Sequence, residues 1–304
     1  VFGPFERNIS NGGDRIELQN HTGRRMNVLD FEDGEDWPVA ADGSGATLAK
    51  IRPQAATEPA ANWSFSTQVG GTPGAANGDF PDEAADGLMI SEVTAGNVGS
   101  FWVELHNPSD QPVELNGLIL ASSELTGRDY QLPNQTLAPG EYHVVTDAQL
   151  GFQPEASDRL WLMSADRGQV LDAVRVGDRL QGRSAQQQQR WQFPSAATPG
   201  GENVFSFHDQ IVINEIMYQA RPQYEQAPDI PFAESDEEWI ELYNRSQQTV
   251  DLGGWSLSDA VRFEFPQGTL IGPDQYLVIA QNADQLAALH PDIVIAGEFS
   301  RRLS

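Results

Sequence analysis

Four glutamates are placed in pairs that could carry out acid–base chemistry. Glu215 and Glu241 lie on two neighbouring expected strands, and Glu92 and Glu104 occupy the corresponding positions earlier in the chain. Two carboxylates that face each other can serve as the acid and the base of a hydrolase. Catalysis needs two carboxyl groups with different pKa values, however, and an identical repetition does not supply that difference. We therefore predict that the glutamates are structural, and we name no catalytic residue.

Two acidic clusters are candidates for a calcium site. Calcium takes roughly six to eight oxygen ligands, usually from loops, and we expect both clusters to lie in loops. Neither has EF-hand spacing, so a solvated loop is the alternative. No other cofactor is expected. The candidate ligands are Asp30, Asp33 and Asp36 in the first cluster and Glu234, Asp236 and Glu237 in the second.

Other chemistries find no support in the sequence. The chain has no cysteine, its five histidines are scattered, and the Gly-x-Ser-x-Gly motif of serine hydrolases does not occur. Most of the seven tryptophans lie at repeated strand positions and are expected in packed sheets. Trp161 differs, because its counterpart in the repeat is Glu17. We expect Trp161 at the surface, where it could contact a ligand such as carbohydrate.

The charge of the chain is strongly negative. It carries 44 acidic and 18 basic residues, a net charge of −26, and Lys50 is its one lysine. Such a surface repels phosphate groups, so we expect no nucleic-acid partner. No run of about 18 apolar residues occurs, so we expect no membrane insertion. The composition suits a secreted or cell-surface protein, and the missing initiator Met suggests a mature or trimmed segment.

Short strands are the expected secondary structure throughout. Residues 211–216, 239–243 and 276–280 are rich in β-branched and aromatic residues and are bounded by glycine and proline. Runs of this length and spacing are typical of an antiparallel β-sandwich of immunoglobulin type. Helix is expected only in short turns such as 283–289.

An internal repeat determines the domain organisation. Residues 88–145 match residues 211–279 in motif order, and residues 158–203 match residues 14–77. The last nine residues also resemble residues 2–10, so that the sequence after Ser304 would continue at Asn11. We predict a back half of a domain at 1–80, a complete domain at 87–205 and a front half at 210–304.

The repeated motifs are N-E-I at 214–216, E-W-I-E-L-Y-N at 238–244, D-L-G-G-W-S-L-S-D at 251–259, S-N-G-G-D-R-I-E-L at 10–18 and G-T-P-G-A-A-N at 71–77. Together they resemble the lamin tail domain, an immunoglobulin-like β-sandwich of nuclear lamins and of many secreted bacterial proteins. The middle copy departs from the pattern, with Ser91 in place of Asn, Leu118 in place of Trp and a shortened back half.

The expected function is mechanical. The resemblance implies a non-enzymatic module, and the two half domains imply that 210–304 is completed by a 1–80 segment of the next copy or chain. The partner would be another copy of the protein, joined head to tail into a filament. A longer covalent array and a ring closed within one chain are alternatives for the joint. The alternative function is a carbohydrate-binding or other ligand-binding accessory module of a larger secreted enzyme.

Overall fold

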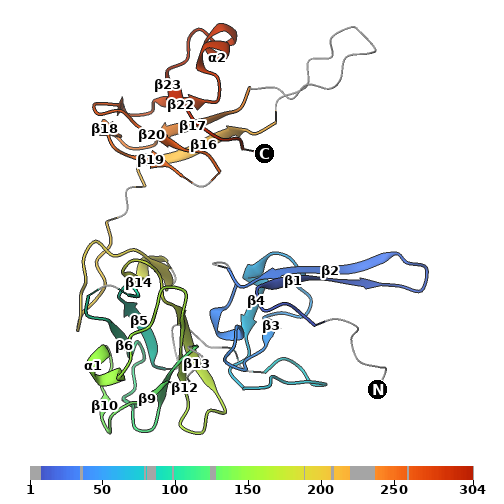
Figure 1. Ribbon diagram of the computed structural model, residues 1–304, viewed down its shortest axis with the longest axis vertical. Coiled ribbons are helices and arrows are strands. Elements are labelled where there is room, and N and C mark those ends of the chain that lie inside the picture. The colour runs from blue at the N-terminus through green and yellow to red at the C-terminus, as the bar shows by residue number, and fades with distance from the viewer. Residues whose placement is uncertain are drawn as a thin grey trace. The chain divides into compact units, whose positions relative to one another are not determined.

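The computed structural model describes residues 8–34, 37–78, 80, 87–97, 99–123, 128–187, 189–206, 209–219, 237–258 and 260–303. The chain divides into two compact units (Figure 1). Unit 1 is Val1–Ser206 and unit 2 is Phe207–Ser304. No helix in the described part of the chain is long and apolar enough to cross a membrane.

The centre of unit 1 is a sandwich of two antiparallel sheets. One has the strand order β11-β6-β5-β14-β15 and the other the order β13-β12-β8-β9. Alternate side chains of each sheet meet in a common core, in which Ile90, Leu120 and Leu160 are all 0% exposed. The strands are β5 (Met89–Val93), β6 (Trp102–His106), β8 (Ile119–Ser122), β9 (Asp129–Gln131), β11 (Tyr142–Thr146), β12 (Arg159–Met163), β13 (Val170–Arg175), β14 (Gln181–Ser184) and β15 (Arg190–Gln192).

Two smaller elements complete this sandwich. Strands β7 (Val113–Glu114) and β10 (Thr136–Leu137) pair with each other. The short helix α1 (Asp147–Leu150) follows β11 and is closed by a capping box between Thr146 and Gln149. Gly151 ends the helix at φ 75°, a left-handed conformation that favours glycine.

The first 80 residues form two separate strand pairs. Strands β1 (Gly13–Gln19) and β2 (Arg25–Glu32) make a long hairpin, and β3 (Leu48–Lys50) pairs with β4 (Trp63–Phe65). Short 3-10 turns at Val39–Ala41 and Ala60–Asn62 connect them. Residues 39–69 of this segment are docked on the central sandwich of unit 1 and are called the docked segment below.

The docking surface is the outer face of the β13-β12-β8-β9 sheet. Ala40, Ala46 and Phe65 form one buried cluster with residues of that sheet, including Trp161 and Met163. Backbone bonds extend the contact, because Val170 N donates to the Thr67 carbonyl at 2.8 Å and Val69 N to the Gly168 carbonyl at 2.9 Å. Arg159 and Arg175 add ion pairs with Asp33 and Asp42.

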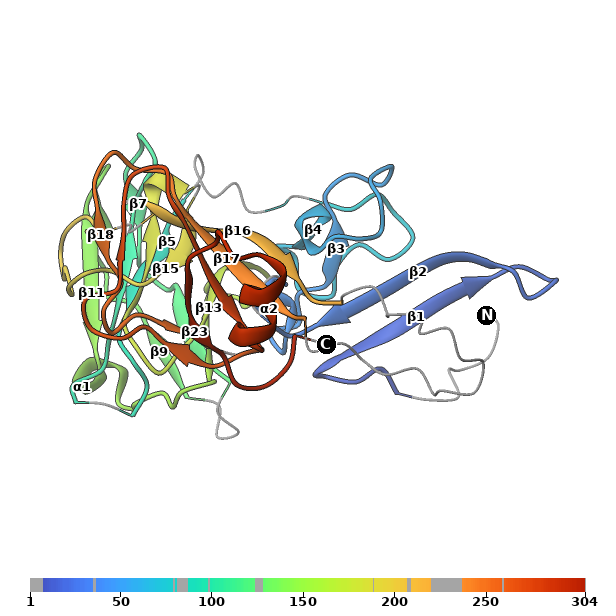
Figure 2. The ribbon, with the colours of Figure 1, turned by 90° about the horizontal axis from the view of Figure 1, so that it is seen from above.

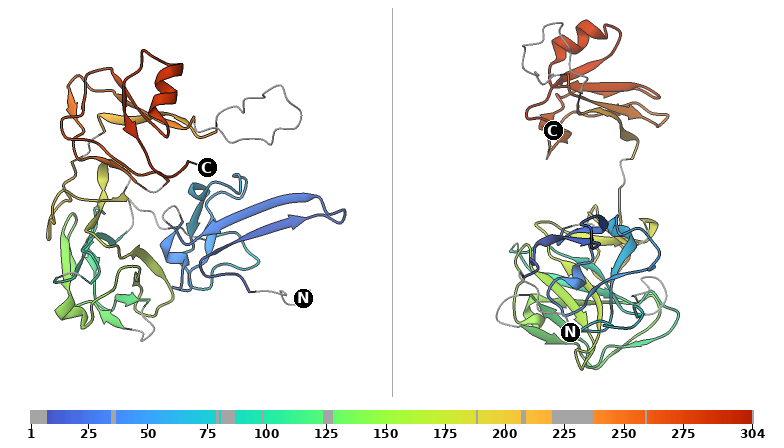
Figure 3. Two further views of the ribbon diagram at one scale, coloured as in Figure 1. Left: turned by 45° about the horizontal axis from the view of Figure 1, so that its top comes forward. Right: turned by 90° about the vertical axis from the view of Figure 1, so that its right-hand side faces the viewer.

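Unit 2 is built around a four-stranded sheet of order β16-β17-β22-β23. Two further pairs, β18-β21 and β19-β20, cover a core that includes Leu242, Leu252 and Ile279. The elements are β16 (Ile211–Met217), β17 (Trp239–Asn244), β18 (Val250–Asp251), β19 (Ser256–Leu257), β20 (Phe263–Glu264), β21 (Leu270–Ile271), β22 (Tyr276–Ala280), α2 (Ala283–Leu289) and β23 (Ile295–Glu298). Figure 3 shows unit 2 in orange and red from two sides.

The same buried asparagine organises both front halves. Asn107 Nδ2 donates to the carbonyls of Gln111 and Leu137 at 2.8 and 3.0 Å. Asn244 Nδ2 donates to the carbonyls of Gln248 and Ile271 at 2.7 and 2.9 Å. Both asparagines are 0% exposed, and both side chains bind loop carbonyls that would otherwise be buried unpaired. The sequence repeat is therefore a repeat of atomic structure.

The expected all-β class is confirmed, and α2 spans the residues predicted for a short helix. One strand departs from the antiparallel expectation. β23 runs parallel to β22, after a crossover that contains α2. A parallel pair needs such a crossover connection, and the sequence motifs of this region carried no signal for it.

Candidate interaction surface

In the central sandwich of unit 1, which is called the complete domain below, later strands cover the first strand β5. Strand β5 lies inside its sheet, with β6 on one side and β14 on the other. Ile90 and Val93 of β5 are 0% exposed. The back half of the domain thus supplies both a partner for the edge of β5 and a cover for its apolar side chains.

Strand β16 is the counterpart of β5 and lacks that cover. It pairs with β17, and no other strand of the described chain pairs with it. Ile213 and Ile216, the counterparts of Ile90 and Val93, are 57% and 47% exposed. An edge strand with exposed β-branched residues is a template for pairing with a further strand.

The hairpin β1-β2 shows the converse feature. It extends away from the rest of unit 1, as the blue strands of Figure 2 show. Ile16 and Leu18 are 45% and 63% exposed, whereas their counterparts on β12, Leu160 and Leu162, are 0% exposed in the core. On strand β1, Ile16 and Leu18 therefore alternate like the side chains of a core strand but remain about half exposed.

A pair of buried carboxylates fastens the last loop of the complete domain. Glu92 Oε2 accepts hydrogen bonds from the backbone N and the Oγ1 of Thr198, both at 3.1 Å. Glu104 accepts from Ser91 Oγ at 2.7 Å and from Gly200 N at 2.5 Å. Glu92 is on β5 and Glu104 is on β6, whereas Thr198 and Gly200 lie in the loop after β15. These hydrogen bonds therefore connect the front half of the domain to its back half.

Burial changes the acidity of this pair. Desolvation raises the pKa of Glu92 to about 7, against the opposing effect of the Thr198 hydrogen bonds. The pKa of Glu104 is also raised, chiefly by burial. A carboxylate removed from water is disfavoured in its charged form, so the fold holds these groups at an energetic cost that hydrogen bonds offset in part.

The counterparts of this pair are open in unit 2. Glu215 is exposed and Glu241 is partly exposed. Asn214 Nδ2 donates to Glu241 Oε1 at 2.7 Å, the same length as the bond from Ser91 to Glu104. The middle copy has Ser91 where unit 2 has Asn214, and each of these side chains donates a hydrogen bond to the glutamate of the second strand, Glu104 or Glu241.

The back halves also share their strand contacts. Arg183 lies over the Trp191 ring at 4.9 Å, and Lys50 lies over the Trp63 ring at 6.0 Å, each pair being opposite in register. A cation over an indole face is attracted by the ring. Residues 48–65 are therefore built like β14 and β15.

Three of the six calcium candidates, Asp30, Asp33 and Glu237, lie in the described part of the chain. Asp30 lies in strand β2 rather than in the expected loop, opposite Arg15. Asp33 binds Arg175 and Arg159, and the hydrogen bond from Arg175 lowers its pKa. Glu237 accepts a bond from Gln285 at 3.2 Å. Asp36, Glu234 and Asp236 lie outside the described residues, and among the described residues no group of three or more His, Asp or Glu is placed to hold a metal ion.

Trp161 is buried, and the prediction of an exposed side chain there is wrong. The Trp161 side chain points away from the sandwich core, because it alternates along β12 with Leu160 and Leu162, which point into that core. The segment docked on the outer face of the sheet then covers it, leaving 8% exposed, and an added Cβ at Gly43 would lie 3.2 Å from the ring. Trp161 thus offers no open platform for a sugar.

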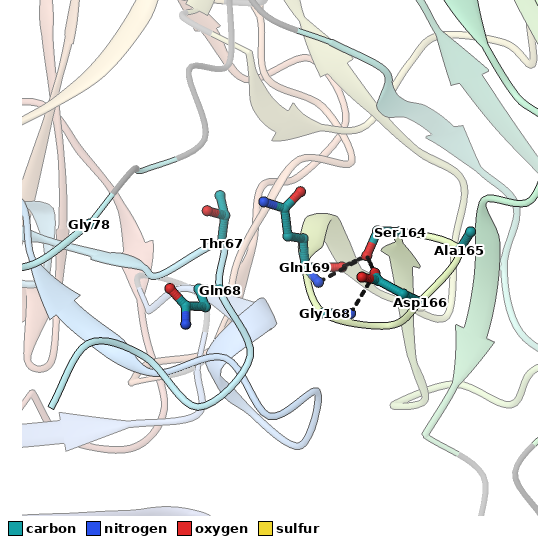
Figure 4. A pocket seen from close by; sticks show the side chains of 8 residues that line it. All are labelled: Thr67, Gln68, Gly78, Ser164, Ala165, Asp166, Gly168 and Gln169. Atoms are coloured by element: carbon teal, nitrogen blue, oxygen red, sulfur yellow. Dashed lines mark hydrogen bonds between the residues drawn. The ribbon is translucent and has the colours of Figure 1, made fainter.

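A shallow hollow of about 660 Å³ lies beside this docked segment. Thr67 and Gln68 line one side, and the β12-β13 turn lines the other (Figure 4). Asp166 accepts bonds from Ser164 Oγ at 2.6 Å and Gly168 N at 3.0 Å, which lower its pKa. Its polar atoms stabilise the turn, so the hollow has no evident chemistry.

Comparison with known proteins gives one match. A family model described as Lamin Tail Domain matches residues 81–178 and 206–299. No curated protein and no solved structure matches the chain. The two matched segments contain the asparagine and glutamate positions described above, although the first ends before β14.

Proposed function

Because the chain belongs to the lamin tail domain family, whose members are structural or interaction modules of immunoglobulin-like fold, we propose that it works by completing other copies of itself. In this proposal a segment of the 1–80 type adds to a unit of the 210–304 type. The next repeat of a longer chain or a separate copy supplies the segment, and the assembly grows head to tail. The module is non-catalytic and acts in a secreted or cell-surface setting, which its charge of −26 suits.

The observation that carries the proposal is the contrast at one strand. Ile213 and Ile216 are about half exposed on β16, and the same positions on β5 are fully buried by a back half. The β1-β2 hairpin exposes the side chains that such a back half buries. Two surfaces that are buried against each other in the complete domain are therefore both open in this chain.

The energetics favour closure. Full burial of one exposed side chain of this kind contributes roughly 1.5–3 kcal/mol. Ile213, Ile216, Ile16 and Leu18 are already about half buried, so closing the joint over all four contributes on the order of 5 kcal/mol. Strand addition to the edge of β16 adds backbone hydrogen bonds. Head-to-tail contact between different surfaces is heterologous and leaves a free end on each side, so the product is an open filament.

Sedimentation velocity over a concentration series tests the proposal with the 304-residue chain. We expect oligomers that grow with concentration and filaments under the electron microscope. Ile213→Asp should leave monomers, with association weakened more than about 100-fold, because a charge would be buried at the joint. Leu289→Asp is the control, since Leu289 is 53% exposed on α2. A wild-type chain that stays a compact monomer at every concentration would contradict the proposal and favour the ring.

A further inference from the structure

The proposed joint contains a carboxylate-binding site that neither half shows in full. We infer that the loop of residues 72–77 of one copy binds the carboxylates of Glu215 and Glu241 of the next. This inference rests on the proposed function and names the groups that would fasten it.

The loop is already in its binding conformation. Ala75 N donates to the Thr72 carbonyl at 3.1 Å, and Gly201 N donates to the Thr198 carbonyl at 2.9 Å. Gly74 and Gly200 have φ of 82° and 85°. Loop 72–77 therefore has the turn that in the complete domain points two backbone N–H groups at glutamates.

The far end of the loop is anchored in the same way. Asn77 Nδ2 donates to the Lys50 carbonyl at 2.9 Å, as Asn203 Nδ2 donates to the Arg183 carbonyl at 3.2 Å. Asn203 makes a second bond, to the Ser91 carbonyl at 2.9 Å. The counterpart of Ser91 is Asn214 on β16. Among the described residues, the Asn77 amide donates only to the Lys50 carbonyl and has no bond that corresponds to the one from Asn203 to Ser91.

The donors of the loop are free for a ligand. Within the part of the chain that the structure describes, Thr72 N and Gly74 N donate to no other residue. Their counterparts, Thr198 N and Gly200 N, bind Glu92 and Glu104. Two backbone donors and a threonine hydroxyl at fixed spacing suit two carboxylate groups, and charge-assisted bonds of this kind are strong.

The carboxylates are placed to fit. Glu215 and Glu241 are opposite each other in the β16-β17 register, as Glu92 and Glu104 are in the β5-β6 register. In both strand pairs the register shifts just before the glutamate of the first strand, between Ile213 and Glu215 in β16 and between Ile90 and Glu92 in β5. Asn214 also donates a hydrogen bond to Glu241, as Ser91 does to Glu104 in the complete domain. The unit 2 pair thus presents the same acceptors to solvent that the complete domain presents to its loop.

A binding measurement on the whole chain tests this site. Glu215 is exposed in the single chain, so Glu215→Ala should leave its melting temperature unchanged and weaken association about tenfold or more. Glu264→Ala, an exposed glutamate of the same unit whose counterpart Gln131 is also exposed, should change association less than about twofold. Thr72→Val removes the opposing hydroxyl and should weaken association too. The double variant Glu215→Ala with Thr72→Val should lose less than the sum of the two single losses.

The outcomes separate the two ideas. If Glu215→Ala associates like the wild type while Ile213→Asp does not, the carboxylate site is wrong and domain completion stands. If the losses of Glu215→Ala and Thr72→Val are simply additive, the two residues do not meet and the site is also wrong. If the wild-type chain does not associate, or if association survives both Glu215→Ala and Ile213→Asp, both proposals fail.

Discussion

At the scale of single residues, Glu92 and Glu104 are ionisable groups without any exposed surface. A buried carboxylate is costly unless hydrogen bonds replace its water. Thr198 and Gly200 supply such bonds, and the pKa of Glu92 still rises to about 7 because desolvation is the larger effect. The proton on this group is therefore linked to the stability of the complete domain.

We predict a pH-dependent difference between wild type and Glu92→Gln. The folded pKa lies above the usual value of 4.5, so the folded state holds the proton more tightly. The stabilising effect is full below about pH 4.5 and is lost as pH rises through about 7. A shift of this size corresponds to at most about 3 kcal/mol. Relative to Glu92→Gln, wild-type unit 1 should therefore lose stability between pH 5 and 8.

Melting temperatures across that range measure the effect. Glu114→Gln serves as the control, because Glu114 is exposed on β7, and its difference from wild type should stay constant. Comparing each variant with wild type at the same pH removes the contribution of His106 and His143, whose pKa values burial lowers. A constant difference for Glu92→Gln would show that Glu92 is already ionised in the fold at pH 5.

At the scale of elements, strand β12 serves two cores. Leu160 and Leu162 face the sandwich, while Trp161 and Met163 face the docked segment. Successive side chains of a strand point to opposite faces, so one strand can hold two neighbours independently. The docked segment packs on this second face of β12 and on neighbouring residues of β8 and β13.

We predict that Trp161→Ala releases the docked segment and spares the sandwich. Removing a buried tryptophan costs roughly 3–5 kcal/mol, and the loss falls on the contacts of Ala40, Ala46 and Phe65. Hydrogen exchange measured by mass spectrometry should show faster exchange in residues 39–69 and little change in β5 and β6. Phe193→Ala, at a side chain that is 59% exposed, is the control. Equal loss of protection in β5 would mean that the two cores unfold together.

The sequence predicted what depends on local pattern. Short apolar runs between glycine and proline predicted the strands, and residues 283–289 predicted α2. Repetition of Glu92 and Glu104 at Glu215 and Glu241 predicted a structural role, because a role shared by two copies belongs to the fold.

Features that depend on distant segments were missed. The burial of Trp161 requires residues more than one hundred positions earlier to fold over it, which no local pattern encodes. The parallel pairing of β23 depends on where the crossover returns, and the pairing of Asp33 with Arg159 and Arg175 depends on the same docking. For the candidate site, the repeat predicts the paired glutamates, whereas no side-chain pattern points to their backbone donors in residues 72–77 and 198–203. The one sequence signal for these donors is the T-P-G triplet that recurs at 72–74 and 198–200.

At the scale of the whole molecule, like charge opposes association. Each copy carries a net charge of −26, so two copies repel each other before their apolar surfaces meet. The Debye length falls from about 10 Å at 0.1 M salt to about 3 Å at 1 M. Salt therefore weakens the repulsion far more than it would weaken the burial of Ile213 and Leu18 in the proposed joint.

We predict that association strengthens with salt. Raising NaCl from 20 to 500 mM should increase the association constant of the wild-type chain about tenfold or more, as measured by sedimentation or light scattering. Sucrose at matched osmolality controls for effects other than screening. Association that weakens steadily with salt would point instead to a joint held by opposite charges.

The difference between Trp161 and Glu17 bears on the fidelity of assembly. On β12 of the complete domain this position is Trp161, whose indole packs against the docked segment. On strand β1 it is Glu17, whose carboxylate accepts a hydrogen bond from Arg15. A docked segment placed one domain out of step would bury Glu17 and leave Trp161 bare. If copies associate as proposed, this position therefore distinguishes the domain that receives a docked segment from the domain formed at the joint.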